Sequence, residues 1–148
     1  MNEIPDLWGG EISISALSPV SILRSQDELL RRKTKGALTA EVRTRKETDG
    51  PHTLFVHTMD LSAPILGYSE TILEASHREN FPYPVVIDLS EELRETTETQ
   101  APRPTKCFEP DEFMRALGNI LSSQPVRSVI ASLIARSNDV KPLAEIVG

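Results

Sequence analysis

The spacing of apolar residues changes twice along this chain, and this change limits the fold more than any other feature. Near both ends, apolar residues recur at the spacing of an amphipathic helix. Between residues 38 and 89 they alternate with polar residues, as in strands that expose one face to water. The pattern therefore predicts the α+β class, in which a sheet packs its apolar face against helices.

The first helix is expected to begin at Ser18-Pro19, because serine favours the cap position and proline the first helical turn. Leu23 and Leu30 lie on one stripe of this helix, and Gly36 marks its end. In the last third of the chain, one helix should begin at Pro110 and another after Pro125. The last helix has apolar residues at helical spacing, namely Val126, Val129, Ile130, Leu133 and Ile134.

Four strands are predicted between the helical ends, at residues 38–46, 53–59, 68–77 and 85–87. Asp49-Gly50 favours a tight hairpin between the first two strands. Short connections between consecutive strands favour an antiparallel meander. The prediction is a four-stranded antiparallel sheet with an N-terminal helix and two C-terminal helices on one face, in the order α-β-β-β-β-α-α.

A chain of 148 residues has the length of one domain, so residues 1–148 are predicted to form a single α+β domain. Residues 1–17 are expected to be an extended N-terminal arm, with Trp8 covering the edge of the core. Residues 90–106 are rich in Glu, Thr and Pro and contain little besides Leu93 to bury. Because burial cannot offset the entropy of ordering such a segment, we expect a mobile acidic loop there, in which Glu91–Glu95 could form a short helical turn.

The N-terminus has no secretory pattern, and no apolar run approaches the roughly 20 residues that span a bilayer. We therefore expect a cytoplasmic protein without a membrane segment. Cys107 is the only cysteine, so no internal disulfide can form. The expected role of Cys107 is a partly buried thiol that covers the core.

The charge is unevenly distributed, although the net charge is −6. From Arg24 to Lys46 there are eight bases and three acids, a balance of +5, which leaves −11 for the remainder. Such an asymmetry either marks a binding surface or is neutralised when folding brings the acidic remainder close. The residues predicted to form a binding surface are Arg31, Arg32 and Lys35 on the first helix, and Arg43, Arg45 and His57 on the open face of the sheet.

A catalytic or metal site has weaker support in the sequence. His57, Asp60, Glu70 and Glu74 could converge on the polar face of the sheet, which would suit a small metal-dependent enzyme. However, the sequence contains no HExxH, no paired Cys-x-x-Cys, no Gly-x-Ser-x-Gly and no glycine-rich phosphate loop. We predict no catalytic residue, no metal ligand and no cofactor.

The favoured function is therefore a non-catalytic interaction module that binds another macromolecule, most simply a protein. Regulatory subunits, neutralisers and assembly chaperones share this profile, and a sheet edge could also pair with a second copy to form a homodimer. A nucleic-acid-binding protein that uses the basic stretch from Arg24 to Lys46 is the alternative, but the overall acidity and the low aromatic content of 5% argue against it.

Overall fold

Residues 3–10, 17–96 and 104–147 are described by the computed structural model of the protein. The sheet has five antiparallel strands in the order β1-β2-β3-β4-β5. The elements in chain order are α1 (Pro19–Lys33), β1 (Thr39–Asp49), β2 (His52–Ala63), the 3-10 turn η1 (Pro64–Leu66), β3 (Tyr68–Arg78), β4 (Val85–Leu89), α2 (Glu91–Thr96), β5 (Thr105–Cys107), α3 (Pro110–Leu121) and α4 (Gln124–Val147).

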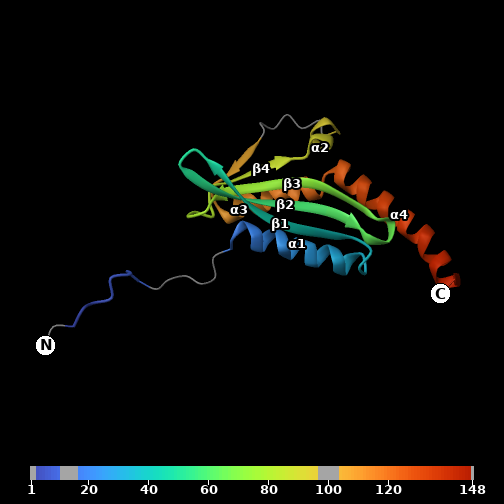
Figure 1. Ribbon diagram of the computed structural model, residues 1–148, viewed down its shortest axis with the longest axis horizontal. Coiled ribbons are helices and arrows are strands. Elements are labelled where there is room, and N and C mark those ends of the chain that lie inside the picture. The colour runs from blue at the N-terminus through green and yellow to red at the C-terminus, as the bar shows by residue number, and fades with distance from the viewer. Residues whose placement is uncertain (1–2, 11–16, 97–103, 148) are drawn as a thin grey trace.

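Helices cover one face of the sheet, as the sequence predicts (Figure 1). Leu23 of α1, Phe113 of α3 and Leu133 of α4 are all buried in one cluster with the inward side chains of the strands. This cluster includes Met59 and Leu73, both 0% exposed, from the central strands β2 and β3. The α+β class, the antiparallel sheet and the placement of the three long helices on one face are therefore confirmed.

The number of strands and the order of elements differ from the prediction. The segment expected to be a loop begins with the short helix α2 and ends with the strand β5. Leu93 of α2 and Cys107 of β5 are both buried in the core, which accounts for the order at the two ends of this segment. A strand of three residues is too short to show an alternating pattern, so β5 could not be recognised. Residues 97–103 lie outside the described ranges, and the mobility expected there stays a prediction.

The first helix begins and ends where its sequence predicts. The Ser18 side chain caps α1 by accepting a hydrogen bond from the backbone N–H of Ser21 at 3.2 Å. After Lys33 the chain turns with left-handed backbone angles, φ 52° at Lys35 and φ 83° at Gly36. The Gly36 N–H donates to the carbonyl of Arg31 at 2.8 Å, which closes the last turn of the helix.

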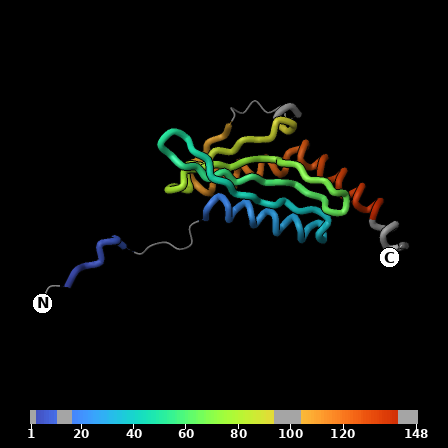
Figure 2. The backbone as a smooth tube through the Cα atoms, in the orientation of Figure 1, coloured from blue at the N-terminus to red at the C-terminus, as the bar shows by residue number. Residues whose placement is uncertain are grey.

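The hairpin between β1 and β2 is longer than predicted, and a two-residue turn closes it. Gly50 takes φ +61°, which favours glycine, at the first position of the turn Gly50-Pro51. Asp49 then pairs with His52, and the pairing continues without interruption to Thr39 and Ser62. The tip of this hairpin projects beyond the rest of the sheet (Figure 2).

A bulge shifts the pairing of β2 with β3. Met59 pairs with Leu73, but the next residue, Asp60, pairs with Thr71. Ile72 is thus an extra residue, and it is 5% exposed beside the fully buried Leu73. The strict alternation expected for residues 70–75 is wrong at Ile72, because a bulge lets two consecutive side chains face the core.

The N-terminal segment 3–10 projects away from the sheet and helices (Figure 1). Its three large apolar side chains are exposed, with Ile4 at 88%, Leu7 at 82% and Trp8 at 83%. The expectation that Trp8 covers the core is therefore wrong. None of the helices in the described ranges has both the length and the apolar character that crossing a membrane requires.

Candidate functional site

The outer edge of β1 is the longer of the two edges of the sheet, since β1 has 11 residues and β5 has three. In a hairpin with a two-residue loop, the residues that flank the loop exchange both backbone hydrogen bonds. Here these residues are Asp49 and His52. Odd-numbered residues of β1 therefore direct their N–H and C=O groups toward β2, and even-numbered residues direct theirs outward.

A side chain from α1 occupies the first of these outward groups. The N–H of Ala40 donates to Asp27 Oδ1 at 2.7 Å. Asp27 also pairs with Arg31 at 3.0 Å, so its carboxylate fixes both the helix surface and the start of the strand. This bond from Ala40 supports the assignment of even-numbered residues to the outer edge.

Beyond Ala40, the edge of β1 is open. Val42, Thr44, Lys46 and Thr48 direct their N–H and C=O groups outward, and within the described ranges no other backbone segment pairs with them. Unpaired strand edges readily accept another extended chain. We call the outward backbone groups of Val42, Thr44, Lys46 and Thr48 the open edge.

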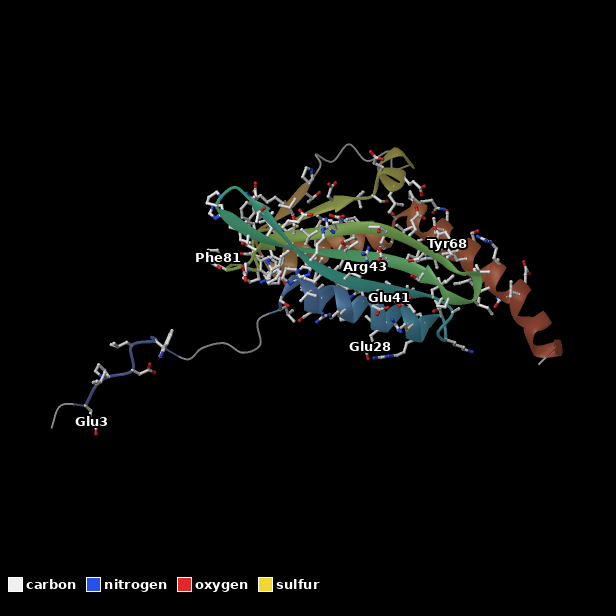
Figure 3. The ribbon with its side chains drawn as sticks, viewed as in Figure 1. Glu3, Glu28, Glu41, Arg43, Tyr68 and Phe81 are labelled. Atoms are coloured by element: carbon white, nitrogen blue, oxygen red, sulfur yellow. The ribbon has the colours of Figure 1, made fainter. Side chains whose placement is uncertain are left out.

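Two of the predicted binding residues, Arg43 and Arg45, lie together beside this edge on the open face (Figure 3 labels Arg43). The Arg43 guanidinium pairs with the carboxylate of Asp60. Arg45 donates to Thr58 Oγ1 at 3.1 Å and contacts Glu74 at 3.2 Å. Arg43 therefore reaches a carboxylate on β2, whereas Arg45 extends across β2 to a carboxylate on β3.

Asp60 is held charged by this network, although it is only 8% exposed. Burial by itself would raise the pKa of Asp60, but the hydrogen bonds from Arg43 and Thr71 and the charge of Arg43 outweigh it and leave the pKa below its ordinary value. The hydroxyl of Thr71 donates to Asp60 Oδ1 at 2.7 Å. The carboxylate is thus a fixed anchor for an arginine that is itself exposed.

His57 does not lie beside these arginines, and its expected place on the open face is wrong. It pairs with Thr44 and Ala75, which belong to the helix-covered face, and it is 3% exposed. The hairpin is longer than predicted, but side chains still alternate between the two faces along each strand, so His57 stays on the helix-covered face. The sequence pattern left the face of His57 open to error because Leu54, Val56, Phe55 and Met59 make both faces of β2 partly apolar.

A chain of hydrogen bonds holds His57 in its neutral form. His77 Nδ1 faces the carbonyl oxygens of Arg78 at 2.8 Å and Phe81 at 3.2 Å, so it must donate. In neutral His77, Nε2 then accepts from Nε2 of His57 at 2.9 Å, and Nδ1 of His57 accepts from the Thr44 hydroxyl at 2.8 Å. Burial, as the largest cause, acts together with the charges of His77 and Arg24 to lower the pKa of His57 to about 4.

Of the predicted bases on and after α1, only Arg31 contacts the open face, where Glu41 lies between it and Arg43. Arg31 pairs with Asp27 and lies 3.9 Å from Glu41, whereas Arg32 pairs with Glu28 at 2.8 Å along the helix. Lys35 stands in the turn that follows α1. These three bases therefore form no continuous surface with Arg43 and Arg45.

Internal ion pairs neutralise much of the basic stretch that suggested nucleic-acid binding. Arg31, Arg32, Arg43, Arg45 and Lys46 all contact carboxylates within 4 Å. Binding to a phosphate backbone depends on a continuous row of bases that are available to the phosphates. Asp60, Glu74 and Glu79 come from outside the stretch, so the fold neutralises part of the charge asymmetry, whereas Arg31 and Arg32 pair with acids of the stretch itself.

The described residues do not form the metal site considered above. His57 and the pair Asp60 and Glu74 lie on opposite faces of the sheet. In the described ranges, no group of three or more His, Cys, Asp or Glu side chains could hold a metal ion. Burial also raises the pKa of the Cys107 thiol, which disfavours the reactive thiolate.

Comparison with known proteins assigns no family. No protein-family model, curated protein or solved structure matches the chain. The function is therefore inferred from the residues of the chain itself.

Sequence reasoning named a sheet edge as a surface that could pair with another chain, but it did not identify which backbone groups point outward, and it missed the Thr44–His57–His77 chain. The outward groups could have been found, since Asp49-Gly50-Pro51 implies a two-residue turn and the turn fixes which amides point outward. The histidine chain could not, because it depends on the register between three strands, which the turn between β2 and β3 and the bulge together determine.

Proposed function

We propose that this protein is a non-catalytic module that binds an extended segment of another protein along the open edge of β1. The observation that carries the proposal is the row of outward N–H and C=O groups at Val42, Thr44, Lys46 and Thr48, beyond the point where Asp27 covers the strand. An added strand would satisfy these groups and continue the sheet.

The charges beside the edge favour an acidic partner over a second copy of β1. Residues 42–48 carry Arg43, Arg45, Lys46 and Glu47, three bases to one acid, and the three bases would exchange their exposed ion pairs with Asp60, Glu74 and Glu79 for acidic residues of a partner. Pairing β1 with β1 of another copy would place two such strands together, and like charges on neighbouring strands are destabilising. The side chains of Arg43 and Lys46 remain 66% and 60% exposed, so both can contact acidic residues of a partner.

The exposed segment 3–10 supports the same class of function. Ile4, Leu7 and Trp8 contribute a large exposed apolar area, and apolar side chains in such numbers are common where proteins contact each other. This segment and the open edge belong to different parts of the molecule, so a partner could use either or both.

The decisive experiment compares Lys46→Pro with Lys46→Ala. Both variants remove the side chain that pairs with Glu79, but only proline removes the outward N–H. A partner first identified by affinity purification should bind the alanine variant somewhat more weakly than the wild type, because the charge of Lys46 is lost, and should bind the proline variant about tenfold more weakly than the alanine variant. Circular dichroism and thermal melting would check that both variants fold.

Hydrogen exchange supplies a second readout that needs no substitution. The amides of Val42, Thr44 and Lys46 should exchange quickly in the free protein and slowly in the complex. A partner that binds both Lys46 variants equally and protects none of these amides would refute edge binding. If light scattering showed a stable dimer whose formation protects them, the occupant of the edge would be a second copy.

A further inference from the structure

A second surface lies on the open face, where the sheet twists beneath the tip of the β1–β2 hairpin. A hollow of about 490 Å³ is lined there by residues that include Asp49, Leu54, Arg78, Phe81, Val86 and Lys106. Asp49 is on β1 and Lys106 on β5, which would lie about 19 Å apart in a flat sheet of five strands. Because both line one hollow, the twist of the sheet folds its two edges toward each other.

The register places the floor of this hollow on the open face. Leu54 pairs with Arg78, whereas Val86 pairs with Ser76 on one side and Lys106 on the other. The connection between β3 and β4 supplies the wall, and Phe81 at this end of the molecule is labelled in Figure 3. Six parts of the chain therefore build the hollow, namely the five strands and the connection between β3 and β4, and its lining contains none of the four residues of the open edge.

Two cations line the hollow without a carboxylate partner. In the described parts of the chain, neither Arg78 nor Lys106 forms an ion pair, in contrast to Arg43, Arg45 and Lys46. The Lys106 ammonium lies 5.5 Å from the centre of the Phe108 ring, a contact that leaves its hydrogen-bond donors available. Among the described residues that line the hollow, which also include His77, Asp49 is the one acid and faces the two cations Arg78 and Lys106.

The apolar part of the lining is also accessible. Phe81 is 58% exposed, which is unusual for a large aromatic side chain unless it contacts a partner or ligand. Leu54 and Val86 are partly buried and belong to the floor of the hollow, which the sheet provides. A concave site of several hundred Å³ with an apolar floor and a few polar groups is typical of small-molecule binding.

We propose that this hollow binds a small organic anion, with its carboxylate or phosphate group between Arg78 and Lys106 and its apolar part against Leu54, Phe81 and Val86. Charge-assisted hydrogen bonds from the guanidinium and the ammonium select the anion. Asp49 opposes the bound charge and so weakens the binding. The site is independent of the protein partner proposed for the edge of β1.

Phenyl phosphate is a suitable probe, with inorganic phosphate as the comparison. Titration followed by amide chemical shifts should perturb Ser76, Arg78, Val86 and Lys106 in the folded full-length protein. Phenyl phosphate should bind more tightly than inorganic phosphate, because only its ring can contact the apolar floor. In Arg78→Gln or Lys106→Gln, the affinity for phenyl phosphate should fall about tenfold.

Two further variants test whether the charge of the lining determines the affinity for phenyl phosphate. Asp49→Asn removes the opposing charge and should strengthen binding, whereas Arg127→Gln removes an exposed cation on α4 and should change nothing. Shifts confined to other regions, affinities unchanged in Arg78→Gln and Lys106→Gln, or weaker binding by Asp49→Asn would each overturn the proposal. Equal binding of the two phosphates would overturn the assignment of the apolar floor.

Discussion

His57 and Thr58 are neighbours on β2, and both are 3% exposed, yet they are buried by different means. His57 lies on the helix-covered face, beside Thr44 and Ala75. Together with burial, the charge of Arg24 from α1 lowers the pKa of His57. Thr58 lies on the open face, where the Arg45 side chain donates to its hydroxyl. One face is closed by packed helices, and the other by long charged side chains that lie along it.

The two kinds of burial have different consequences. Side chains packed among helices and strands cannot leave without opening a cavity, so the covered face provides stability. The arginines of the open face can exchange an internal carboxylate for water or for a partner at little cost, because exposed ion pairs contribute little. The open face is therefore the adaptable surface, and low exposure alone does not identify the core.

The largest test of this difference compares two adjacent residues of β3. Leu73 is 0% exposed on the covered face, whereas the Glu74 side chain is 42% exposed on the open face. We expect Leu73→Ala to lower the free energy of unfolding by about 3 kcal/mol and Glu74→Ala by less than about 1 kcal/mol. Urea denaturation of the two variants measures both values.

A similar loss in both variants would contradict the distinction between the faces. Leu73→Met serves as the control, because it keeps the volume of the side chain and should cost less than about 1.5 kcal/mol. If Leu73→Ala alone is strongly destabilising, the core lies on the helix-covered face only.

Lowering the pH should destabilise the covered face through His57. The unfolded chain protonates this histidine below its ordinary pKa of 6.5, whereas the folded protein keeps it neutral down to about 4. Between these values the unfolded state binds more protons, so stability is complete above the upper value and is lost as the pH falls toward the lower one. At pH 5 the loss should be about 2 kcal/mol relative to neutral pH.

Denaturation of wild type and His57→Gln at several pH values measures this loss. The glutamine variant is less stable at neutral pH, but its stability should change less between neutral pH and pH 5, because the titrating group is gone. His52→Gln, which alters an exposed histidine at the hairpin, should keep the full dependence. Parallel profiles for wild type and His57→Gln would show that His57 is not the group responsible.

The sequence was sufficient for the features that depend on local pattern. The start of α1 at Ser18-Pro19, the turn at Gly50 and the apolar stripe of the last helix follow from neighbouring residues, and the structure confirms them. The meander follows from short connections between strands. Each of these features needs information from only a few consecutive positions.

Features that depend on the pairing of several strands could not be predicted from the sequence. The bulge at Ile72 and the three-residue strand β5 leave no periodic signal, and the face of His57 depends on a register that the sequence states only indirectly. Among the predicted site residues, only Arg43 and Arg45 lie side by side, since they are two positions apart on one strand. Arg31, Arg32 and Lys35 lie on α1 or in the turn after it, where pairing with acids of the same helix decides the role of the first two.

The smallest expected effect concerns the ion pair between Arg45 and Glu74, whose atoms are 3.2 Å apart. A double-mutant cycle with Arg45→Ala and Glu74→Ala should give a coupling energy of about 0.2–1 kcal/mol that decreases as salt is added. The cycle for Lys46 and Glu79, a second exposed pair at 3.2 Å, is the matched control and should give a similar value. A coupling energy near zero or within this range would mean that Arg45 can leave Glu74 at little cost and contact a partner. If the coupling instead exceeded about 2 kcal/mol and persisted at high salt, the arginines would be structural elements of the open face, and their part in binding a partner would have to be abandoned.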